Sequence, residues 1–251
     1  MLIDSHLHLV NEDYDMNEVI KRANDDGVKY LIVSGSNRVD NSLNIQLLNG
    51  YNNVFFSVGF HPDCAGKVSN DDFDMLEELI RNEKVVAIGE IGLDYFYGKD
   101  NRDEQKKLFV RQLEIAERYD LPVVIHTREA FWDTYNILKE HNVRGVIHCF
   151  SGSLEVALKY IGLGFYLGIG GVVTFKNSNL KEVVKKIGVD NVIFETDSPY
   201  LSPFRGEKNE PCNVKVICDY VADLLGFSFE KVANITTSNA MRLFDLSGRI
   251  W

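Results

Sequence analysis

Short apolar runs rich in β-branched residues recur along the chain and alternate with longer segments of helical periodicity. The apolar runs lie at residues 2–5, 28–33, 54–58, 85–89, 122–126, 145–148, 164–167 and 192–195. In the segments between them, for example 15–27, 71–82 and 102–120, apolar residues recur at helical spacing. Several of these segments begin with Asp, Asn or Ser and several end at glycine. The pattern predicts eight strands that alternate with helices.

Strands that alternate with helices pair in parallel, because each crossover helix returns the chain to the edge of the sheet from which it left. Eight such units close into a TIM-type (β/α)8 barrel, whose typical length of about 250 residues matches the 251 residues of this chain. We therefore expect an α/β fold in which residues 1–251 form a single barrel domain. Its functional site is expected at the carboxyl ends of the strands. Residues 211–226 and 228–244 are expected to be the eighth crossover helix and a terminal packing helix.

Composition and charge narrow the class of protein. The apolar share of 45% and the charged share of 25% are typical of a globular protein. The segment MLIDSHLHLV has no signal-peptide features, and no apolar run reaches the length of a membrane span, so we expect a soluble cytoplasmic protein. Four cysteines without a C-x-x-C pair are expected to be reduced thiols. The net charge of −10 argues against broad adhesion to nucleic acid but allows binding of a strand end.

Six residues with metal-binding side chains stand at the ends of these apolar runs. His6 and His8 form an H-x-H pair, and the two-residue period of a strand places both imidazoles on one face. The others are Glu90, His126, His148 and Asp197. Taken singly, each is equally well explained as a helix-capping carboxylate or a buried histidine. Because the carboxyl ends of parallel strands meet at one end of a barrel, the set as a whole predicts a metal site there.

The number of candidate ligands bears on the number of ions. Six ligands exceed the three protein ligands usual for one catalytic zinc, so we expect two divalent ions, which mixed nitrogen and oxygen ligands allow to be Zn, Mg or Mn. Glu90 lies nearest the middle of the ligand set and is the candidate for a carboxylate shared by both ions. Two such ions would bind a water and lower its pKa. The predicted reaction is hydrolysis by a metal-bound hydroxide.

Seven stretches, in order along nearly the whole chain, resemble the TatD family of metal-dependent deoxyribonucleases in the amidohydrolase superfamily. They are DSHLH (4–8), GFHPD (59–63), GEIGLDY (89–95), IHTREA (125–130), HCFSG (148–152), ETDSPYLSP (195–203) and RGEKNEP (205–211). The resemblance implies a deoxyribonuclease that trims single-stranded DNA from its 3′ end. The family motif at the last stretch usually reads R-G-K, whereas this chain has Glu207 after Gly206, which puts a phosphate contact at position 207 in doubt.

The resemblance also implies roles for the six ligands. It places His6, His8 and Asp197 on one ion, and His126 and His148 on the other, with Glu90 shared. Glu90 and Asp197 are the catalytic candidates. As a ligand beside the attacking water, Asp197 is expected to accept its proton and pass it to the leaving oxygen, with simple ligation as the alternative.

Three further residues are candidates for binding substrate. His61, at the end of the third run, is expected to hydrogen-bond a phosphate oxygen or a metal-bound water. Arg128 offers a guanidinium to a phosphate, with a salt bridge to Glu129 as the alternative. Arg205 is a second phosphate candidate, although arginines are common on surfaces.

Supporting residues are also suggested by position. Asp4 and Glu195 precede candidate ligands by two residues, so they either orient imidazoles or are polar groups of the barrel interior. Tyr95, Phe96 and Phe175 lie in expected loops at the same end of the barrel, where they either stack on a nucleobase or pack against the protein.

Two other functions remain open at this point. The same two-metal barrel can hydrolyse another ester or an amide, for example an aminoacyl-RNA linkage or a small phosphodiester, since the fold does not decide the substrate. A more distant alternative is a metal-binding scaffold without catalysis. No protein partner is predicted from the sequence.

Overall fold

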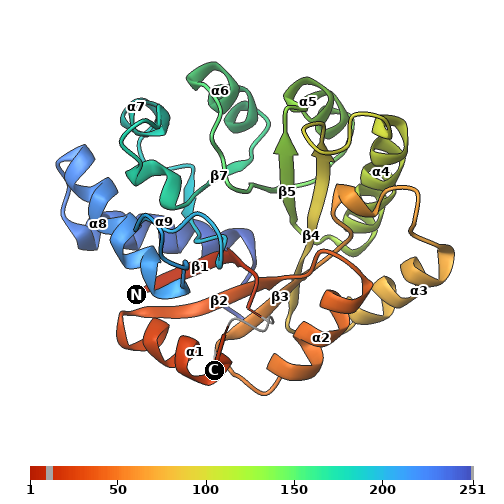
Figure 1. Ribbon diagram of the computed structural model, residues 1–251, viewed down its shortest axis with the longest axis horizontal. Coiled ribbons are helices and arrows are strands. Elements are labelled where there is room, and N and C mark those ends of the chain that lie inside the picture. Colours follow the sequence, from red (N-terminus) through yellow and green to blue (C-terminus); the bar gives the residue numbers. More distant parts are fainter. Residues whose placement is uncertain (10–13, 250–251) are drawn as a thin grey trace.

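The computed structural model describes residues 1–9 and 14–249 and places eight strands in one sheet around a central axis (Figure 1). The strands are β1 Leu2–Leu7, β2 Val28–Ser34, β3 Val54–Val58, β4 Val85–Asp94, β5 Val123–Arg128, β6 Gly145–Ile147, β7 Tyr166–Ile169 and β8 Val192–Phe194. Each coincides with an apolar run of the sequence to within a few residues. The exception is β4, which continues to Asp94 instead of ending at residue 89.

The strands follow one another in chain order around the sheet, and every neighbouring pair from β1–β2 to β7–β8 is parallel. The barrel is closed by the segment after β8. The amide of Asp197 donates to the carbonyl of His6 (3.0 Å), and the amide of His8 donates to the carbonyl of Ser198 (2.8 Å). Together with the alternating helices, this is the expected TIM-type (β/α)8 architecture.

The helices occupy the segments in which helical periodicity was found. They are α1 Met16–Asp25, α2 Arg38–Leu48, α3 Asn70–Leu79, α4 Arg102–Tyr119, α5 Phe131–Lys139, α6 Leu154–Gly162, α7 Leu180–Ile187, α8 Val214–Leu225 and α9 Phe229–Leu243. Side chains cap several amino termini: Ser69, for example, accepts from the amide of Asp72, whose carboxylate in turn accepts from the amide of Ser69. Local sequence therefore fixes where these helices begin. None of the helices in the described ranges is long and apolar enough to span a membrane.

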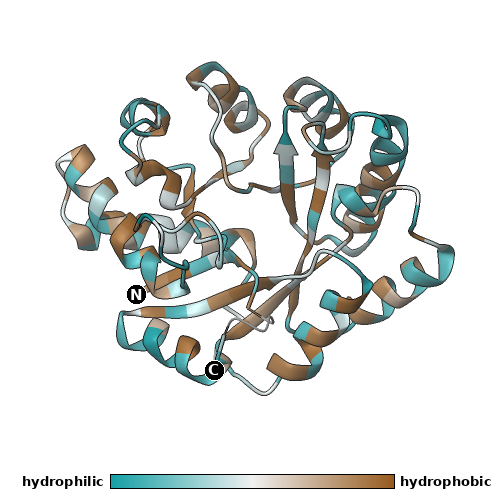
Figure 2. Cartoon of the chain, viewed as in Figure 1, coloured by the Kyte–Doolittle hydropathy of each residue, from teal (hydrophilic) through white to brown (hydrophobic). Residues whose placement is uncertain are grey.

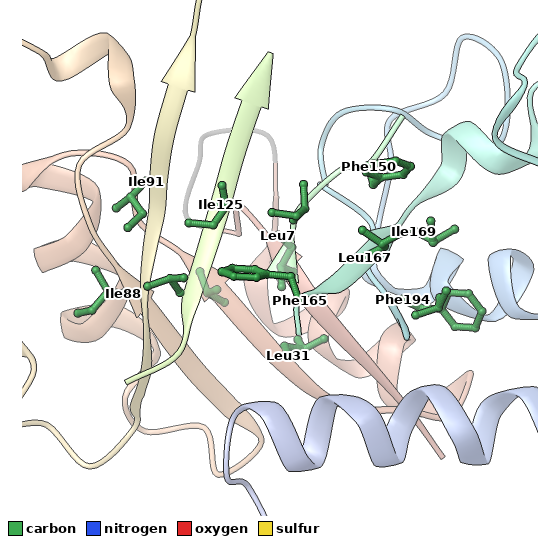
Figure 3. Close-up of a cluster of buried hydrophobic side chains, with 14 of the residues drawn as sticks. Leu7, Leu31, Ile88, Ile91, Ile125, Phe150, Phe165, Leu167, Ile169 and Phe194 are labelled. Carbon is green, nitrogen blue, oxygen red and sulfur yellow. The ribbon is translucent and has the colours of Figure 1, made fainter. Parts of the chain in front are cut away.

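Apolar side chains form two layers of core. The larger layer packs the strands against the surrounding helices, and Figure 3 shows part of it, with Ile88, Ile125 and Leu167 among the labelled side chains. Figure 2 shows the strands largely brown and the helices banded in brown and teal, as expected when each helix turns one face to the sheet. A smaller layer joins side chains such as Ile32 and Val124 to α9.

Helix α9 covers the amino-terminal end of the barrel. The Thr237 hydroxyl donates to the carbonyl of Met1 (2.9 Å), and the Asn239 amide donates to the carbonyls of Val189 (3.1 Å) and Val192 (2.9 Å). These carbonyls lie just before or at the starts of β1 and β8. The opposite end, where the strands finish, is left for the polar residues of the candidate site.

Candidate metal centre

The six predicted ligands meet at the carboxyl ends of the strands. Three lie within strands β1, β4 and β5, and three lie in the segments that directly follow β1, β6 and β8. In chain order they are His6, His8, Glu90, His126, His148 and Asp197. All but the fully buried His6 line a cavity of about 850 Å³. Asp197 reaches it from a backbone with φ of +55°, a left-handed conformation that aspartate tolerates better than most residues.

Four of these side chains form a cage. The Nε2 atoms of His6 and His8 each lie 3.6 Å from Glu90 Oε2 and 3.7 Å from Asp197 Oδ1. His6, His8 and Glu90 are close enough to hold a metal ion together, and so are His6, His148 and Asp197. Buried His6 Nε2 has no hydrogen-bond partner among the described residues, as expected of an atom whose partner is an ion. The cage therefore fits a divalent metal.

The other oxygen of Glu90 faces a second group of histidines. Oε1 lies 2.9 Å from His126 Nδ1, 3.2 Å from His148 Nε2 and 3.9 Å from His61 Nε2. His61, Glu90 and His126 are close enough to hold a metal ion together. Glu90 thus turns one oxygen toward each group, the arrangement needed for a shared carboxylate. His61, which the sequence suggested as a contact to phosphate or water, lies within the histidine group itself.

Buried polar groups hold the imidazoles in place. Ser34 Oγ lies 3.0 Å from His6 Nδ1, and the Ser34 carbonyl lies 3.2 Å from His8 Nδ1. Asp94 Oδ2 lies 3.2 Å from His126 Nε2. Partners of this kind set the tautomer and orientation of ligating histidines. Sequence reasoning missed both residues, although Ser34 follows the second apolar run directly and Asp94 is in the GEIGLDY stretch.

Of the two carboxylates proposed to orient imidazoles, one does so. Glu195 Oε1 lies 3.3 Å from His148 Nδ1 and accepts a hydrogen bond from the amide of Cys149 (2.5 Å). Asp4 instead accepts from the amide and hydroxyl of Thr196 (2.9 and 2.5 Å) and from the amide of His6 (3.3 Å). Asp4 therefore fixes the backbone on both sides of the barrel closure rather than an imidazole ring.

Metal ligation requires neutral imidazoles and ionised carboxylates, and the cluster meets this requirement in part. Burial alone would lower the pKa of His148, but Glu90 and Glu195 outweigh it and hold the pKa well above the ordinary value. Burial and the neighbouring His148 hold the pKa of His6 well below its ordinary value. Burial alone would raise the pKa of Glu90, but His148 and His126 outweigh it and hold the pKa well below the ordinary value. Burial raises the pKa of Asp197 to about 6. The buried Glu90 is therefore ionised and His6 neutral at neutral pH.

The substrate candidates are distributed unequally around the cavity. Arg128 lines it, and its guanidinium stacks on the rings of Phe96 (4.0 Å) and Tyr97 (4.9 Å). Within the described part of the chain, no carboxylate, Glu129 included, forms an ion pair with Arg128. Arg205 is exposed in the segment before α8 and does not line the cavity, so its phosphate contact stays a prediction.

The aromatic candidates also differ from one another. Phe96 and Phe175 are exposed, whereas Tyr95 is buried with its hydroxyl bonded to Asp133 (2.6 Å), so of the two alternatives Tyr95 packs against the protein. Two tyrosines that were not singled out, Tyr97 and Tyr200, line the cavity and are among the most exposed aromatic residues described. Both follow the candidate ligands closely in sequence.

Comparisons with known proteins agree with this geometry. The model of the TatD related DNase family matches residues 3–245. A Bacillus subtilis protein described as the uncharacterized metal-dependent hydrolase YabD is 43% identical, covering 98% of this chain and 100% of the relative. Human deoxyribonuclease TATDN3 is 32% identical, covering 97% of this chain and 94% of the relative.

A solved structure gives the same result for the fold. The crystal structure of the Escherichia coli TatD homolog YJJV superposes with a TM-score of 0.92 at 30% identity, covering 97% of this chain and 98% of the other. Family, ligand pattern and barrel agree along almost the whole chain. The chain belongs to the TatD-related DNase family.

Proposed function

We propose that this protein is a divalent-metal-dependent deoxyribonuclease that hydrolyses phosphodiester bonds and releases nucleotides from the 3′ end of single-stranded DNA. One observation carries the proposal: within one cavity, Glu90 turns Oε2 toward the group that contains His8 and Oε1 toward the group that contains His126. This arrangement is typical of two-metal hydrolases that act on phosphate esters. The human relative named a deoxyribonuclease supports DNA as the substrate.

The ligands divide between two ions in this proposal. His6, His8 and Asp197 hold one ion, His126 and His148 hold the other, and Glu90 is shared, with His61 beside the second group. When bound, two Zn, Mg or Mn ions supply Lewis-acid polarisation of the phosphate and acidification of water. Ser34, Glu195 and Asp94 keep the imidazoles turned toward these positions.

Asp197 is proposed as the acid–base residue. Its Oδ1 faces His6 and His8, which leaves Oδ2 to accept a proton from the attacking water and return it to the leaving 3′ oxygen. Its side chain is 15% exposed, so substrate can reach it. Glu90, only 5% exposed and surrounded by histidines, acts by fixing the two ligand groups relative to each other.

Residues that line the cavity around the ligands are proposed to bind the substrate. The Arg128 guanidinium, 4.0 Å above the Phe96 ring, is proposed to bind two oxygens of a phosphate, and Tyr97 and Tyr200 are proposed to contact the sugar or base. The chain as a whole carries a net charge of −10, which favours contact with a strand end over a long duplex footprint.

The test is hydrolysis of a single-stranded oligonucleotide labelled at its 5′ end, with Mg, Mn or Zn supplied in turn. The expected product is a ladder that shortens from the 3′ end, abolished by EDTA. Glu90→Gln and Asp197→Asn should remove nearly all turnover. Hydrolysis of aminoacyl-RNA, carboxylic ester and amide substrates is measured in parallel under the same conditions. Turnover of one of these, with no nucleotide release under any metal, would overturn the deoxyribonuclease proposal.

A further inference from the structure

A second cavity lies beside the metal centre at the same end of the barrel. It has a volume of about 590 Å³ and is formed by the segments that connect β5 to α5 and β6 to α6, two helices that lie side by side in Figure 1. Arg128 and His148 line both this cavity and the cavity above the metal ligands. The two cavities are therefore neighbours that share part of one wall, so adjacent nucleotides of one strand could occupy them.

The walls of the second cavity carry a tryptophan with an accessible face. Trp132, in the first turn of α5, is 58% exposed, and Phe131 packs against it with ring centroids 4.7 Å apart. Lys159 Nζ lies 5.4 Å from the Trp132 ring. Phe150 lines the same cavity. Large exposed aromatic surfaces on a globular protein commonly mark binding sites, and a flat indole is well suited to stacking on a nucleobase.

The same walls carry two arginines that form no ion pair within the described ranges, beside the carboxylates of Glu129 and Asp133. Arg102 stacks over Tyr95 at 4.4 Å and Arg128 over Phe96, and neither forms an ion pair with any carboxylate of the described residues. Asp133, which also lines the cavity, is already engaged by the Tyr95 hydroxyl (2.6 Å) and Lys106 Nζ (2.8 Å). Two guanidiniums are thus available to a phosphate group.

We propose that the second cavity binds one nucleotide of the single-stranded DNA, adjacent to the phosphodiester at the metal centre, with its base against Trp132 and a phosphate between Arg102 and Arg128. The proposal rests on the proposed function for the identity of the strand. It follows from the wall that the two cavities share, the exposed indole and the two guanidiniums without an ion pair in the part of the chain that the structure describes.

Tryptophan fluorescence tests the proposal directly, because the chain contains only two tryptophans, Trp132 and Trp251. A Trp251→Phe variant, loaded with metal, leaves Trp132 as the sole reporter. It is titrated with a hydrolysis-resistant phosphorothioate oligothymidylate and with an abasic strand of equal length. We expect saturable quenching by the oligothymidylate and much weaker quenching by the abasic strand. Equal responses to both strands, or none, would overturn base stacking at Trp132.

Kinetics with unmodified DNA separate this subsite from the activity itself. Trp132→Ala should raise KM for single-stranded DNA by about 5- to 150-fold, the range for loss of one stacked base, and Trp132→Phe should restore most of it. The matched control is Phe227→Ala, which removes another exposed aromatic ring with a lysine above it (3.5 Å), beyond the end of α8. That control should leave KM unchanged.

The two proposals fail in distinguishable ways. Efficient hydrolysis of DNA with an unchanged KM in Trp132→Ala would reject the subsite and leave the deoxyribonuclease function standing. Base-dependent quenching of Trp132 without hydrolysis under any metal would reject the function while the cavity still binds the strand. Because Trp132 is exposed, its variants should retain the wild-type melting temperature, which verifies that they fold.

Discussion

Replacement of Gly168 by alanine should weaken metal binding without altering any ligand. Gly168 lies in β7, and a Cβ added there would fall 2.3 Å from Glu195 Oε2 and 2.7 Å from its Cδ. Contacts this short force the carboxylate to move. Glu195 is fully buried, accepts a hydrogen bond from the amide of Cys149 and lies 3.3 Å from His148 Nδ1, so a shift disturbs both interactions.

The size of the effect follows from these contacts. Loss of an orienting partner typically lowers metal affinity by about 10- to 100-fold, which corresponds to about 1.4–2.7 kcal/mol. Overpacking of the buried site should lower the free energy of unfolding by about 1–3 kcal/mol as well. Metal affinity is measured by competition with a chromophoric chelator, and stability by denaturant unfolding of the metal-free protein.

Gly162→Ala is the matched control. Gly162 is the last residue of α6, and a Cβ there would meet no atom within 4 Å. This variant should keep wild-type metal affinity and a stability equal to or slightly above wild type. If Gly168→Ala also binds metal with wild-type affinity while losing stability, Glu195 does not support His148 and the reasoning is refuted.

Three further perturbations test other parts of the structure. Ser34→Ala removes the partner of His6 Nδ1 and should lower metal affinity by about 10- to 100-fold in the same chelator assay, with wild-type affinity as the contrary result. Phe244→Ala, in the core layer at the opposite end of the barrel, should reduce the free energy of unfolding by about 3–5 kcal/mol in a denaturant titration yet leave the metal content unchanged. Hydrogen bonds from Ser69 and Arg38 lower the pKa of Asp72 from 3.8 to about 2. A carboxyl with a depressed folded-state pKa stabilises the protein above its unfolded-state pKa and loses that contribution as pH falls. The stability advantage of wild type over Asp72→Asn should therefore shrink between pH 4 and pH 2, and an advantage constant with pH would argue against the ionised cap.

The sequence was sufficient for the order of strands and helices because each strand is a short apolar run and each helix has its own caps and periodicity. Strand ends were less well determined. Glycine and charged residues after residue 89 suggested the end of the fourth strand, but β4 continues to Asp94, fully buried and paired with β5. The contact of Asp94 with His126 was missed for this reason.

The convergence of the six candidate ligands was predictable because the ends of parallel strands meet at one end of a barrel by topology alone. Contacts that depend on side-chain packing were not. Arg128 and Glu129 are adjacent in sequence, yet the guanidinium stacks on Phe96 instead of pairing with its neighbour. The second cavity is formed by residues as distant in sequence as Arg102 and Tyr160, and no local pattern indicates that they share a wall.

The central claim is that two divalent ions share Glu90. The most direct measurement is the number of ions bound per chain, determined by elemental analysis after saturation with Zn or Mn and removal of excess, for wild type and for Glu90→Ala. The account predicts two ions per wild-type chain and fewer than one in the variant, since both sites lose a ligand at once. A wild-type chain that saturates with a single ion, or a variant that still holds two, would contradict it.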